Sequence, residues 1–469
     1  MGVAKYAHLY RLLRNERRPL EELRELQLRR LQRLVAHAYQ EVPYYRRSWE
    51  RLGFHPGDLR SLDDLQKLPV IDKAAFQQHP EELLAGSFRG QPLTAVRTSG
   101  SSGKPLRFWV SPPCNQFRDA QFLRPYLSNG RRLLDKGVWF KVNPLPPPKW
   151  FQRIGMLREQ TIYPGVDLRE QAAAFRRLAP DVLMGHASSA ARLASHLQEE
   201  GAPFKRPRMV FTDSELLTPQ MRRSIREAFG CEPLDVYGTY ETENIAYECD
   251  HHQGYHIALD AVIMEFIRDG RPAGPGEEGE IVCTVLTNFT MPFIRYNLHD
   301  LGSYRTGPCT CGRTFPLMKM IGGRADDYLI HPEGGRKSPW DLWGHLLPLA
   351  EYLHEYQVVQ QEIHLFQVQV VPSRQFHEGI KQAVADKIRL VFPAARVEVL
   401  VTDRIDREPS GKFRAFKTLV RIEEASASRK AGISLPPAPA QGIGVPDREI
   451  QGQGLGPEAA RPFFQPSGT

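Results

Sequence analysis

Apolar residues recur at helical spacing near the start of the chain. Between residues 19 and 49, arginines and glutamates surround one apolar stripe, made of Leu28, Leu31, Leu34, Val35 and Ala38. This period predicts an amphipathic α-helix. A basic amphipathic helix can lie on a membrane, but glutamates alternate with the arginines here. We therefore expect the stripe to pack on the protein's own core.

A second pattern extends from residue 117 through the middle of the chain. Helical segments alternate with short apolar runs, which lie at 138–142, 182–184, 209–211 and 234–236. A helix is predicted from about Pro219 to Phe229, and residues 280–286 form a strongly β-type run. Short buried strands that alternate with helices are typical of α/β proteins. The pattern predicts an α/β fold with several β-sheets flanked by helices.

The pattern changes after Arg324. An alternating segment, a helix and a strand are predicted at 356–371, 375–390 and 397–402. They form a small β-α-β unit of roughly a hundred residues, consistent with a separate, lid-like domain. We predict a large domain over 1–323, a small mobile α+β domain over 324–425 and a disordered tail, rich in proline and glycine, over 426–469.

Bulk properties exclude several classes of protein. A chain of 469 residues is too long for one compact core. No stretch approaches the ~20 apolar residues of a membrane span, and the N-terminus lacks the pattern of a secretory signal. Six cysteines without an export signal indicate reduced thiols or metal ligands, so we expect a cytoplasmic protein. The net charge of +8 is scattered, which disfavours nucleic acid as a partner. The oligomeric state is not determined, and a homodimer is compatible with the sequence.

A loop of small residues follows residues 93–97. It reads Thr98, Ser99, Gly100, Ser101, Ser102, Gly103, Lys104 and Pro105. Glycines let successive backbone N–H groups converge on an anion, and hydroxyls and an ammonium complete the shell around phosphate. The common P-loop needs four residues between its glycines, whereas two separate them here. An ordinary Ser/Gly surface turn is the alternative interpretation.

Further motifs follow this loop in a fixed order. They are TSGSSGKP (98–105), YGTYE (237–241), PFIRYNLHDLG (292–302), GGRADD (322–327) and PSGK (409–412). Together they resemble the adenylate-forming superfamily and, within it, the phenylacetate–CoA ligase family with its CapK-like members. Segments 36–49, 61–73 and 309–316 are also similar to that family, so the resemblance covers nearly residues 20–425.

The resemblance implies a two-step reaction. A small-molecule carboxylic acid attacks the α-phosphate of ATP to give an acyl adenylate and pyrophosphate, and a thiol then displaces AMP. The thiol is that of coenzyme A or of a carrier protein. Mg²⁺, which bridges phosphate oxygens and needs only one or two protein carboxylates, is the implied ion. In this reaction Lys104 belongs to the phosphate loop, and Glu241 matches the family's magnesium ligand.

The nucleotide positions are also carried over by resemblance. Asp300 matches the aspartate that accepts hydrogen bonds from both ribose hydroxyls, and Arg324 matches an arginine near the ribose. The positions expected to line the adenine are Tyr237, Gly238, Thr239, Ser214 and Glu215. The chain departs from the family twice. Asp213 and Ser214 replace glycines, and Tyr240 replaces the usual Ser or Thr, so Tyr240 is expected to wall the acid pocket instead.

Two positions in the C-terminal part complete the implied mechanism. Lys412 matches the catalytic lysine, a cation that stabilises the charge developing during adenylation. Asp326 matches the hinge about which the small domain rotates to admit the thiol. The acid itself is not specified. Segments near 139–143, 185–189 and 237–240 mix aromatic and small polar residues, which suits an aryl or short acyl acid.

A structural Zn²⁺ site is implied by the same resemblance. Its ligands are Cys249, His256, Cys309 and Cys311, and four sulfur or nitrogen ligands suit tetrahedral zinc. His251 or His252 can replace His256 as the fourth ligand. Buried reduced cysteines without metal remain the alternative. The other cysteines, Cys114, Cys231 and Cys283, lie in segments interpreted as loop, turn and strand, and no chemistry is assigned to them.

Alternative functions belong to three classes. An adenylating enzyme of polysaccharide or secondary-metabolite biosynthesis can pass the acyl group to a carrier protein, an amine or a hydroxyl. A non-catalytic nucleotide-binding scaffold can keep the fold. Against it, the chain has all five charged residues expected to act in the reaction, namely Lys104, Glu241, Asp300, Arg324 and Lys412. A basic zinc-containing nucleic-acid binder lacks a clustered Lys/Arg face with interleaved aromatics.

Overall fold

The computed structural model describes most of the chain up to residue 420. The described residues are 4–98, 105–141, 145, 147–148, 150–324, 329–333, 336–337, 342, 345–349, 352–407 and 413–420, with the backbone alone at 150, 321–324, 336 and 347. Residues 1–425 belong to one compact unit. The predicted division at 323/324 therefore stays a prediction, and the predicted tail lies outside the described residues.

A mixed sheet of twelve strands dominates the described part. Their order is β11-β10-β12-β13-β14-β9-β8-β7-β6-β5-β3-β4. The parallel strands are β3 (Gly137–Phe140), β4 (Glu159–Ile162), β5 (Val182–His186), β6 (Met209–Asp213) and β7 (Leu234–Thr239). The antiparallel strands are β8 (Glu243–Tyr247), β9 (Tyr255–Ile257), β10 (Val262–Arg268), β11 (Arg271–Pro272), β12 (Gly279–Val285), β13 (Tyr296–Arg305) and β14 (Leu317–Arg324). The predicted α/β fold is confirmed.

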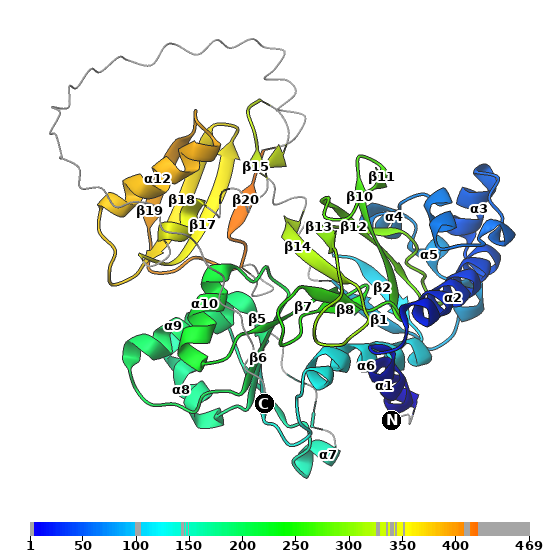
Figure 1. Ribbon diagram of the computed structural model, residues 1–469, viewed down its shortest axis with the longest axis horizontal. Helices are drawn as coiled ribbons and strands as arrows, with labels where there is room; N and C mark the ends of the chain where they lie inside the picture. Colours follow the sequence, from blue (N-terminus) through cyan, green and yellow to red (C-terminus); the bar gives the residue numbers. More distant parts are fainter. Residues whose placement is uncertain are drawn as a thin grey trace, which may run out of the picture. The chain divides into compact units, whose positions relative to one another are not determined.

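Helices cover the parallel half of the sheet on both faces. Figure 1 shows α8 (Leu168–Leu178), α9 (Ala187–Glu200) and α10 (Pro219–Phe229) together on one side. Val138, Leu183 and Val210 point into that layer. Their neighbours Trp139 and Met184 point to the other face, toward α6 (Pro112–Ser128). Because strand side chains alternate, burial on both faces explains why these strands are uninterrupted apolar runs. The predicted helix from Pro219 to Phe229 is confirmed.

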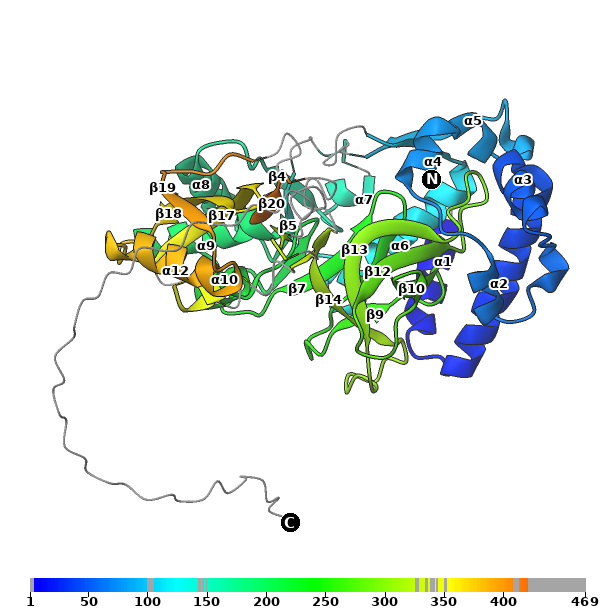
Figure 2. The ribbon, with the colours of Figure 1, turned by 90° about the horizontal axis from the view of Figure 1, so that it is seen from above.

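The N-terminal helices pack on the antiparallel half of the sheet, as the blue segments of Figure 2 show. They are α1 (Ala4–Asn15), α2 (Leu20–Glu41) and α3 (Pro43–Arg51), followed by η1 (Pro56–Asp58), η2 (Asp63–Lys67), α4 (Lys73–Gln78), α5 (Pro80–Leu83) and η3 (Gly86–Phe88). Four members of the predicted stripe are fully buried, namely Leu31, Leu34, Val35 and Ala38. The stripe therefore lies in the core, as predicted. The predicted helix over 19–49 is wrong in one respect, because Pro43 cannot donate to the preceding turn and the helix ends at Glu41.

The small-residue loop connects the two strands of a hairpin. β1 (Thr94–Arg97) pairs antiparallel with β2 (Arg107–Val110). Thr98 donates its N–H to the carbonyl of Leu106 at 2.9 Å, and Leu106 N–H donates to Thr98 Oγ1 at 2.9 Å. These bonds close the base of the loop. Ser99, Gly100, Ser101, Ser102, Gly103 and Lys104 lie outside the described residues.

The C-terminal elements build a second sheet of order β19-β18-β17-β20. Its strands are β17 (Leu353–Glu362), β18 (Leu365–Pro372), β19 (Arg396–Val401) and β20 (Phe416–Thr418), and Figure 1 shows α12 (Gly379–Val391) against it. The segment expected at 356–371 is thus a hairpin of two strands, because Ile363 and His364 form its turn. Four further elements are short: α7 (Trp150–Arg153), β15 (Leu329–Ile330), β16 (Arg336–Lys337) and η5 (Leu347–Leu349). Among the described helices, none has the length and apolarity needed to cross a bilayer.

A buried charged network joins the N-terminal helices to the sheet. Arg124 of α6 pairs with Asp260 at 2.7 Å, and both side chains are fully shielded from solvent. The second oxygen of Asp260 accepts a hydrogen bond from Asn15 at 2.8 Å. An arginine guanidinium without its carboxylate would be very costly to bury. The position of α1 on the sheet therefore depends on this carboxylate.

We predict that Asp260→Ala lowers the free energy of unfolding by about 3–5 kcal/mol, because it leaves Arg124 buried without its partner. Urea denaturation followed by circular dichroism measures the change. The matched control is Glu25→Ala, which removes an exposed partner of Arg29 and should cost less than about 0.5 kcal/mol. Equal losses in the two variants would contradict the structural role of Asp260.

Candidate active site and metal centre

The motif residues gather where the parallel strands end. In open α/β sheets, ligands bind outside the carboxyl ends of the strands. β6 ends at Asp213, which lies opposite Val236 of β7, so the turn at 214–215 leaves the sheet beside Tyr237 and Gly238. The 214–215 segment and the motif YGTYE are thus neighbours.

Tyr237 and Asp300 are brought together from two distant motifs. The Tyr237 hydroxyl donates a 2.8 Å hydrogen bond to Asp300 Oδ2. Asp300 lies in β13, directly opposite Arg324 in the ladder to β14. The carboxylate, the phenol and the backbone of Arg324 therefore lie in one small region.

Gly238 lies in the tight hairpin between β7 and β8. A Cβ atom at this position would lie 2.0 Å from the carbonyl oxygen of Glu243, a distance no structure tolerates. Thr239 closes the turn, because its N–H donates to Thr242 Oγ1 at 3.1 Å. The structure therefore requires glycine at 238 for close approach of the backbone, independently of any adenine.

The carboxylate predicted to bind magnesium is buried and held in place. Glu241 is 8% exposed, and its Oε1 accepts a hydrogen bond from the Tyr296 hydroxyl at 3.2 Å. Arg118 of α6 donates to the carbonyls of Tyr240 at 2.7 Å and Glu241 at 3.4 Å, and it also pairs with Glu243. Burial raises the pKa of Glu243, and Arg118 opposes this rise. The hydrogen bonds from Arg118 hold the backbone of the 240–241 turn in place and thereby orient Glu241.

Sequence reasoning missed two of these side chains. Arg118 had no signal, because a buried arginine on a helix is recognised only from its tertiary partners. Tyr296 lies inside the motif PFIRYNLHDLG, so the motif itself marked the segment but not the contact with Glu241.

The turn at Ser214 and Glu215 has an unusual backbone. Ser214 adopts the left-handed region at φ 67°, which explains why glycine suits this position in the family pattern. Glu215 accepts one hydrogen bond from Ser188 N–H at 2.9 Å and another from Phe413 N–H at 2.5 Å. Phe413 follows Lys412 in the sequence. The carboxylate of Glu215 thus joins the start of α9 to the segment that carries the predicted catalytic lysine.

Some predicted site residues are not described by the structure. Lys412 and Asp326 lie outside the described residues, as do Ser99 to Lys104, and Arg324 is described by its backbone alone. Thr98, Ser214, Glu215, Tyr237, Gly238, Thr239, Tyr240, Glu241 and Asp300 are described. The roles assigned to all of them stay predictions.

Polar and aromatic side chains surround the strand ends where the acid pocket is predicted. Tyr240 is 53% exposed, and burial together with the charges of Asp213 and Glu243 raises its pKa. The ammonium of Lys141 lies 4.2 Å from the centre of the Trp139 ring, a cation–π contact. Nδ1 of His186 is buried and has no hydrogen-bond partner among the described residues. Such a group is available to a bound molecule.

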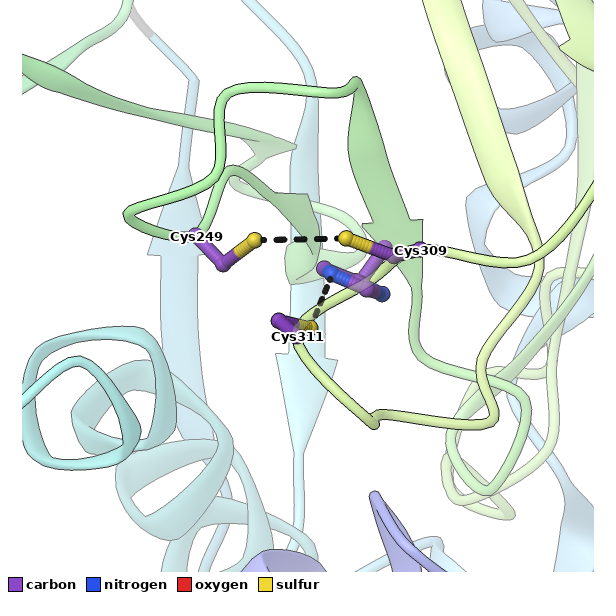
Figure 3. A group of neighbouring side chains, drawn as sticks. Cys249, Cys309 and Cys311 are labelled. Atoms are coloured by element: carbon purple, nitrogen blue, oxygen red, sulfur yellow. Dashed lines mark hydrogen bonds between the residues drawn. The ribbon is translucent and has the colours of Figure 1, made fainter. Parts of the chain in front are cut away.

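The four predicted zinc ligands form a compact cluster at the edge of β9. Their ligand atoms all lie within 4.8 Å of one another, and Figure 3 shows the sulfurs of Cys249, Cys309 and Cys311 turned toward a common centre. Cys249 Sγ is 3.6 Å from Cys309 Sγ, and Cys311 Sγ is 3.4 Å from Nε2 of His256. His251 instead contacts the hydroxyl of Thr310, and His252 lies near Glu248. The structure therefore selects His256 from the three histidines.

The chemistry of this donor set fits a metal. Burial lowers the pKa of His256 to about 4, which keeps its imidazole neutral, and Nδ1 lies 3.3 Å from the carbonyl of Phe315. A carbonyl in that position orients a metal-binding histidine. Hydrogen bonds from Arg313 lower the pKa of Cys311 even though burial opposes them. No disulfide links the cysteines.

Cys114, expected in a loop, lies in the first turn of α6, because Pro112 starts the helix.

A buried acid pair lies beside the cluster. Asp235 accepts hydrogen bonds from Thr212 Oγ1 at 2.5 Å and from the Tyr255 hydroxyl at 2.7 Å. Burial and the neighbouring charge of Glu248 raise the pKa of Asp235 to about 7, whereas Arg222 pairs with Glu248 at 2.9 Å. Asp235 therefore holds a proton near neutral pH.

Known proteins resemble the chain over most of its length. Phenylacetate–coenzyme A ligase of Thermus thermophilus is 30% identical over 355 residues, which cover 73% of this chain and 79% of that protein. The enzyme of the same name from Escherichia coli is 30% identical over 334 residues, 66% of this chain and 73% of that protein. Protein CapK of Staphylococcus aureus is 22% identical over 363 residues, 74% of this chain and 78% of that protein. No profile of a described protein family matches the chain.

Solved structures share the fold. The structure of 2-hydroxyisobutyryl-CoA ligase in the postadenylation state superimposes with a TM-score of 0.72 and 23% identity, over 89% of this chain and 94% of that one. The anthranilate CoA ligase AuaEII gives a TM-score of 0.51 with 15% identity, over 72% of this chain and 68% of that one. At these identities the likeness establishes the architecture.

We predict that stability falls as pH rises from about 4 to about 7 and that Asp235 is a main cause. In this window the folded chain keeps a proton on Asp235 that the unfolded chain, with a pKa near 3.8, has released. The folded state binds more protons, so the free energy of unfolding decreases with pH, by as much as about 4 kcal/mol for this group.

Urea denaturation from pH 4.5 to 8 tests this prediction with Asp235→Asn, which should flatten the decline. Asp269→Asn, at an exposed carboxylate, is the control and should follow the wild type. Parallel curves for the wild type and Asp235→Asn would contradict a raised pKa at Asp235.

Proposed function

The chain belongs to the phenylacetate–coenzyme A ligase family, and we propose that it converts a carboxylic acid into a thioester in two steps, through an acyl adenylate made from ATP. The observation that carries the proposal is the hydrogen bond that joins Tyr237 to Asp300, with the buried carboxylate of Glu241 in the turn that follows Tyr237. Coenzyme A is the proposed thiol, because the relatives at 30% identity carry that cofactor in their names.

Each nucleotide group has a proposed partner. Asp300 accepts hydrogen bonds from the ribose hydroxyls, and its contact with the Tyr237 hydroxyl fixes the direction of the carboxylate. Thr239 and the backbone around Gly238 line the adenine, together with the turn at Ser214 and Glu215. Arg324, in β14, is another proposed partner of the ribose. The loop from Thr98 to Lys104 surrounds the phosphates.

Three charged groups lower the barrier to adenylation. Glu241 is the proposed ligand of Mg²⁺, an ion that neutralises phosphate charge when it is bound. Lys104 and Lys412 are cations that face the phosphates and the attacking carboxylate, which otherwise repel each other. The carboxylate oxygen bonds to the α-phosphorus while the bond to pyrophosphate breaks. The clamp of Arg118 on the 240–241 turn keeps Glu241 in position for this step.

We propose that the second step needs a movement about Asp326. Lys412 then leaves the site, and the thiol attacks the acyl carbonyl while AMP departs. The hydrogen bond from Phe413 N–H to Glu215 belongs to the first state, because it holds the segment after Lys412 beside the 214–215 turn. The division into domains at 323/324 and the mobility of the small domain are parts of this proposal.

A second candidate, which the resemblance to CapK-like members implies, is an enzyme with another acyl acceptor. In this alternative the adenylate passes its acyl group to a carrier protein, an amine or a hydroxyl. AMP release that depends on added coenzyme A separates the two enzymes. A pyrophosphate exchange that depends on a carboxylic acid separates both from a non-catalytic scaffold. The cytoplasmic location and a homodimer stay predictions.

We propose that Cys249, His256, Cys309 and Cys311 hold a structural Zn²⁺. The cluster joins the loop after β8 to the loop between β13 and β14, and β14 also carries Arg324. Four protein ligands leave no open position for a substrate, so the ion stabilises these loops and does no chemistry.

The first experiment tests Lys412. We expect Lys412→Ala to slow pyrophosphate exchange at least about 100-fold and to retain thioester formation from supplied acyl-AMP, because the cation acts on the charge of the first step. The control Lys417→Ala removes an exposed lysine five residues away and should keep both activities. Equal losses in the two half-reactions of Lys412→Ala would contradict its role.

The second experiment tests the metal. We expect about one zinc per chain by inductively coupled plasma mass spectrometry, and its loss in Cys309→Ser, with a lower melting temperature. The control is Cys231→Ser, at a half-buried cysteine outside the cluster, which should keep the zinc. A wild-type protein that contains no zinc after growth in zinc-supplemented medium would refute the site.

A further inference from the structure

A cavity lies away from the strand ends. It has a volume of about 1030 Å³ and lies between α1, α2, the first turns of α6 and the segment 286–289. The volume is that of a small-molecule binding site. No motif of the proposed reaction contributes to its lining.

The lining carries a large excess of positive charge. Six arginines contribute to it, Arg11, Arg14, Arg17, Arg18, Arg30 and Arg33, against the single carboxylate of Glu22. Glu22 already pairs with Arg18 at 2.6 Å. Within the described part of the chain, the guanidinium groups of Arg17 and Arg33 have no hydrogen bond or ion pair. The cavity therefore offers several donors that an anion can use.

Burial and the positive charges of the arginines lower the pKa values of neighbouring groups in the cavity. Burial, and then the charges of Arg11 and Arg30, lower the pKa of His8, which lines the same cavity. Burial lowers the pKa of Arg30, and Arg11 and Arg33 add to this effect while Asp260 opposes it. Arg30 is fixed by donating to the carbonyl of Asp260. Like charges are thus held close by the fold, and a bound anion would relieve their repulsion.

Part of the cavity lining is apolar. Leu12, Leu26, Phe117 and Phe289 contribute to it, and Phe117 is 7% exposed. Guanidinium groups bind phosphate with two parallel hydrogen bonds, and aromatic and aliphatic side chains bind a ring or a chain. A ligand that matches both kinds of lining residue carries a phosphate and an apolar group.

We propose that this cavity is a binding site for a soluble organic phosphate of nucleotide size, separate from the site of the ligase reaction. The geometry disfavours a membrane surface as the occupant. The apolar residues of α2, including Leu31, Leu34 and Val35, are fully buried in the core, so the helix has no apolar face left to insert into a bilayer.

Calorimetric titration of the full chain with adenosine 3′,5′-bisphosphate tests the proposal. We expect Arg17→Gln/Arg33→Gln to weaken binding at least tenfold, because two charged hydrogen-bonding partners are lost. The control, Arg24→Gln/Arg29→Gln, removes the same charge from exposed positions of α2 outside the cavity and should stay within twofold of the wild type. Uncharged adenosine should bind without dependence on Arg17 and Arg33.

Three outcomes would overturn the proposal. The first is equal affinity for the bisphosphate in the wild type and both double variants. The second is no binding of the bisphosphate at 5 mM. The third is sedimentation with phosphatidylglycerol vesicles that needs Arg17 and Arg33, while the bisphosphate fails to bind. Pyrophosphate exchange is measured in parallel, and Arg17→Gln/Arg33→Gln should retain it. The organic-phosphate site and the ligase function therefore succeed or fail independently.

Discussion

The polar face of α6 is the constraint on which the site depends. Arg118, Gln121 and Arg124 follow one another at helical spacing, and all three are buried. Arg118 holds the 240–241 turn, Gln121 donates to the carbonyls of Thr242 and Asn244, and Arg124 pairs with Asp260. One helix thus fixes the turn that carries Glu241 and the segment on which the N-terminal helices rest.

This helix connects the proposed active site to the arginine-rich cavity. Its first turns, with Cys114 and Phe117, line the arginine-rich cavity, and Arg118 is the next residue. A ligand in the cavity contacts α6 on one side, while the 240–241 turn contacts it on another. The two sites therefore share a rigid element although they share no residue.

The cysteine cluster performs a similar task with different chemistry. It joins a loop after β8 to the loop that leads into β14, where Arg324 lies opposite Asp300. Buried polar contacts lie next to it. Glu248 accepts a hydrogen bond from the N–H of Asp235 and pairs with Arg222. Polar groups thus help to locate the segments that carry the site, in addition to apolar packing, because carboxylates and thiols have directional partners.

The sequence by itself determined the class of fold, the core face of α2, four of the five described parallel strands (all but β4) and the order of the motifs. Apolar periodicity indicates which face of a helix is buried. The glycines and charged residues of each motif are adjacent in the sequence, so the motif is recognised without the fold. Only the tertiary structure decided that Tyr237 reaches Asp300, that His256 rather than His251 or His252 joins the cysteines, and that six arginines share one cavity. It also revealed Arg118, because the pattern of a helix does not show which distant carbonyl will satisfy a buried guanidinium.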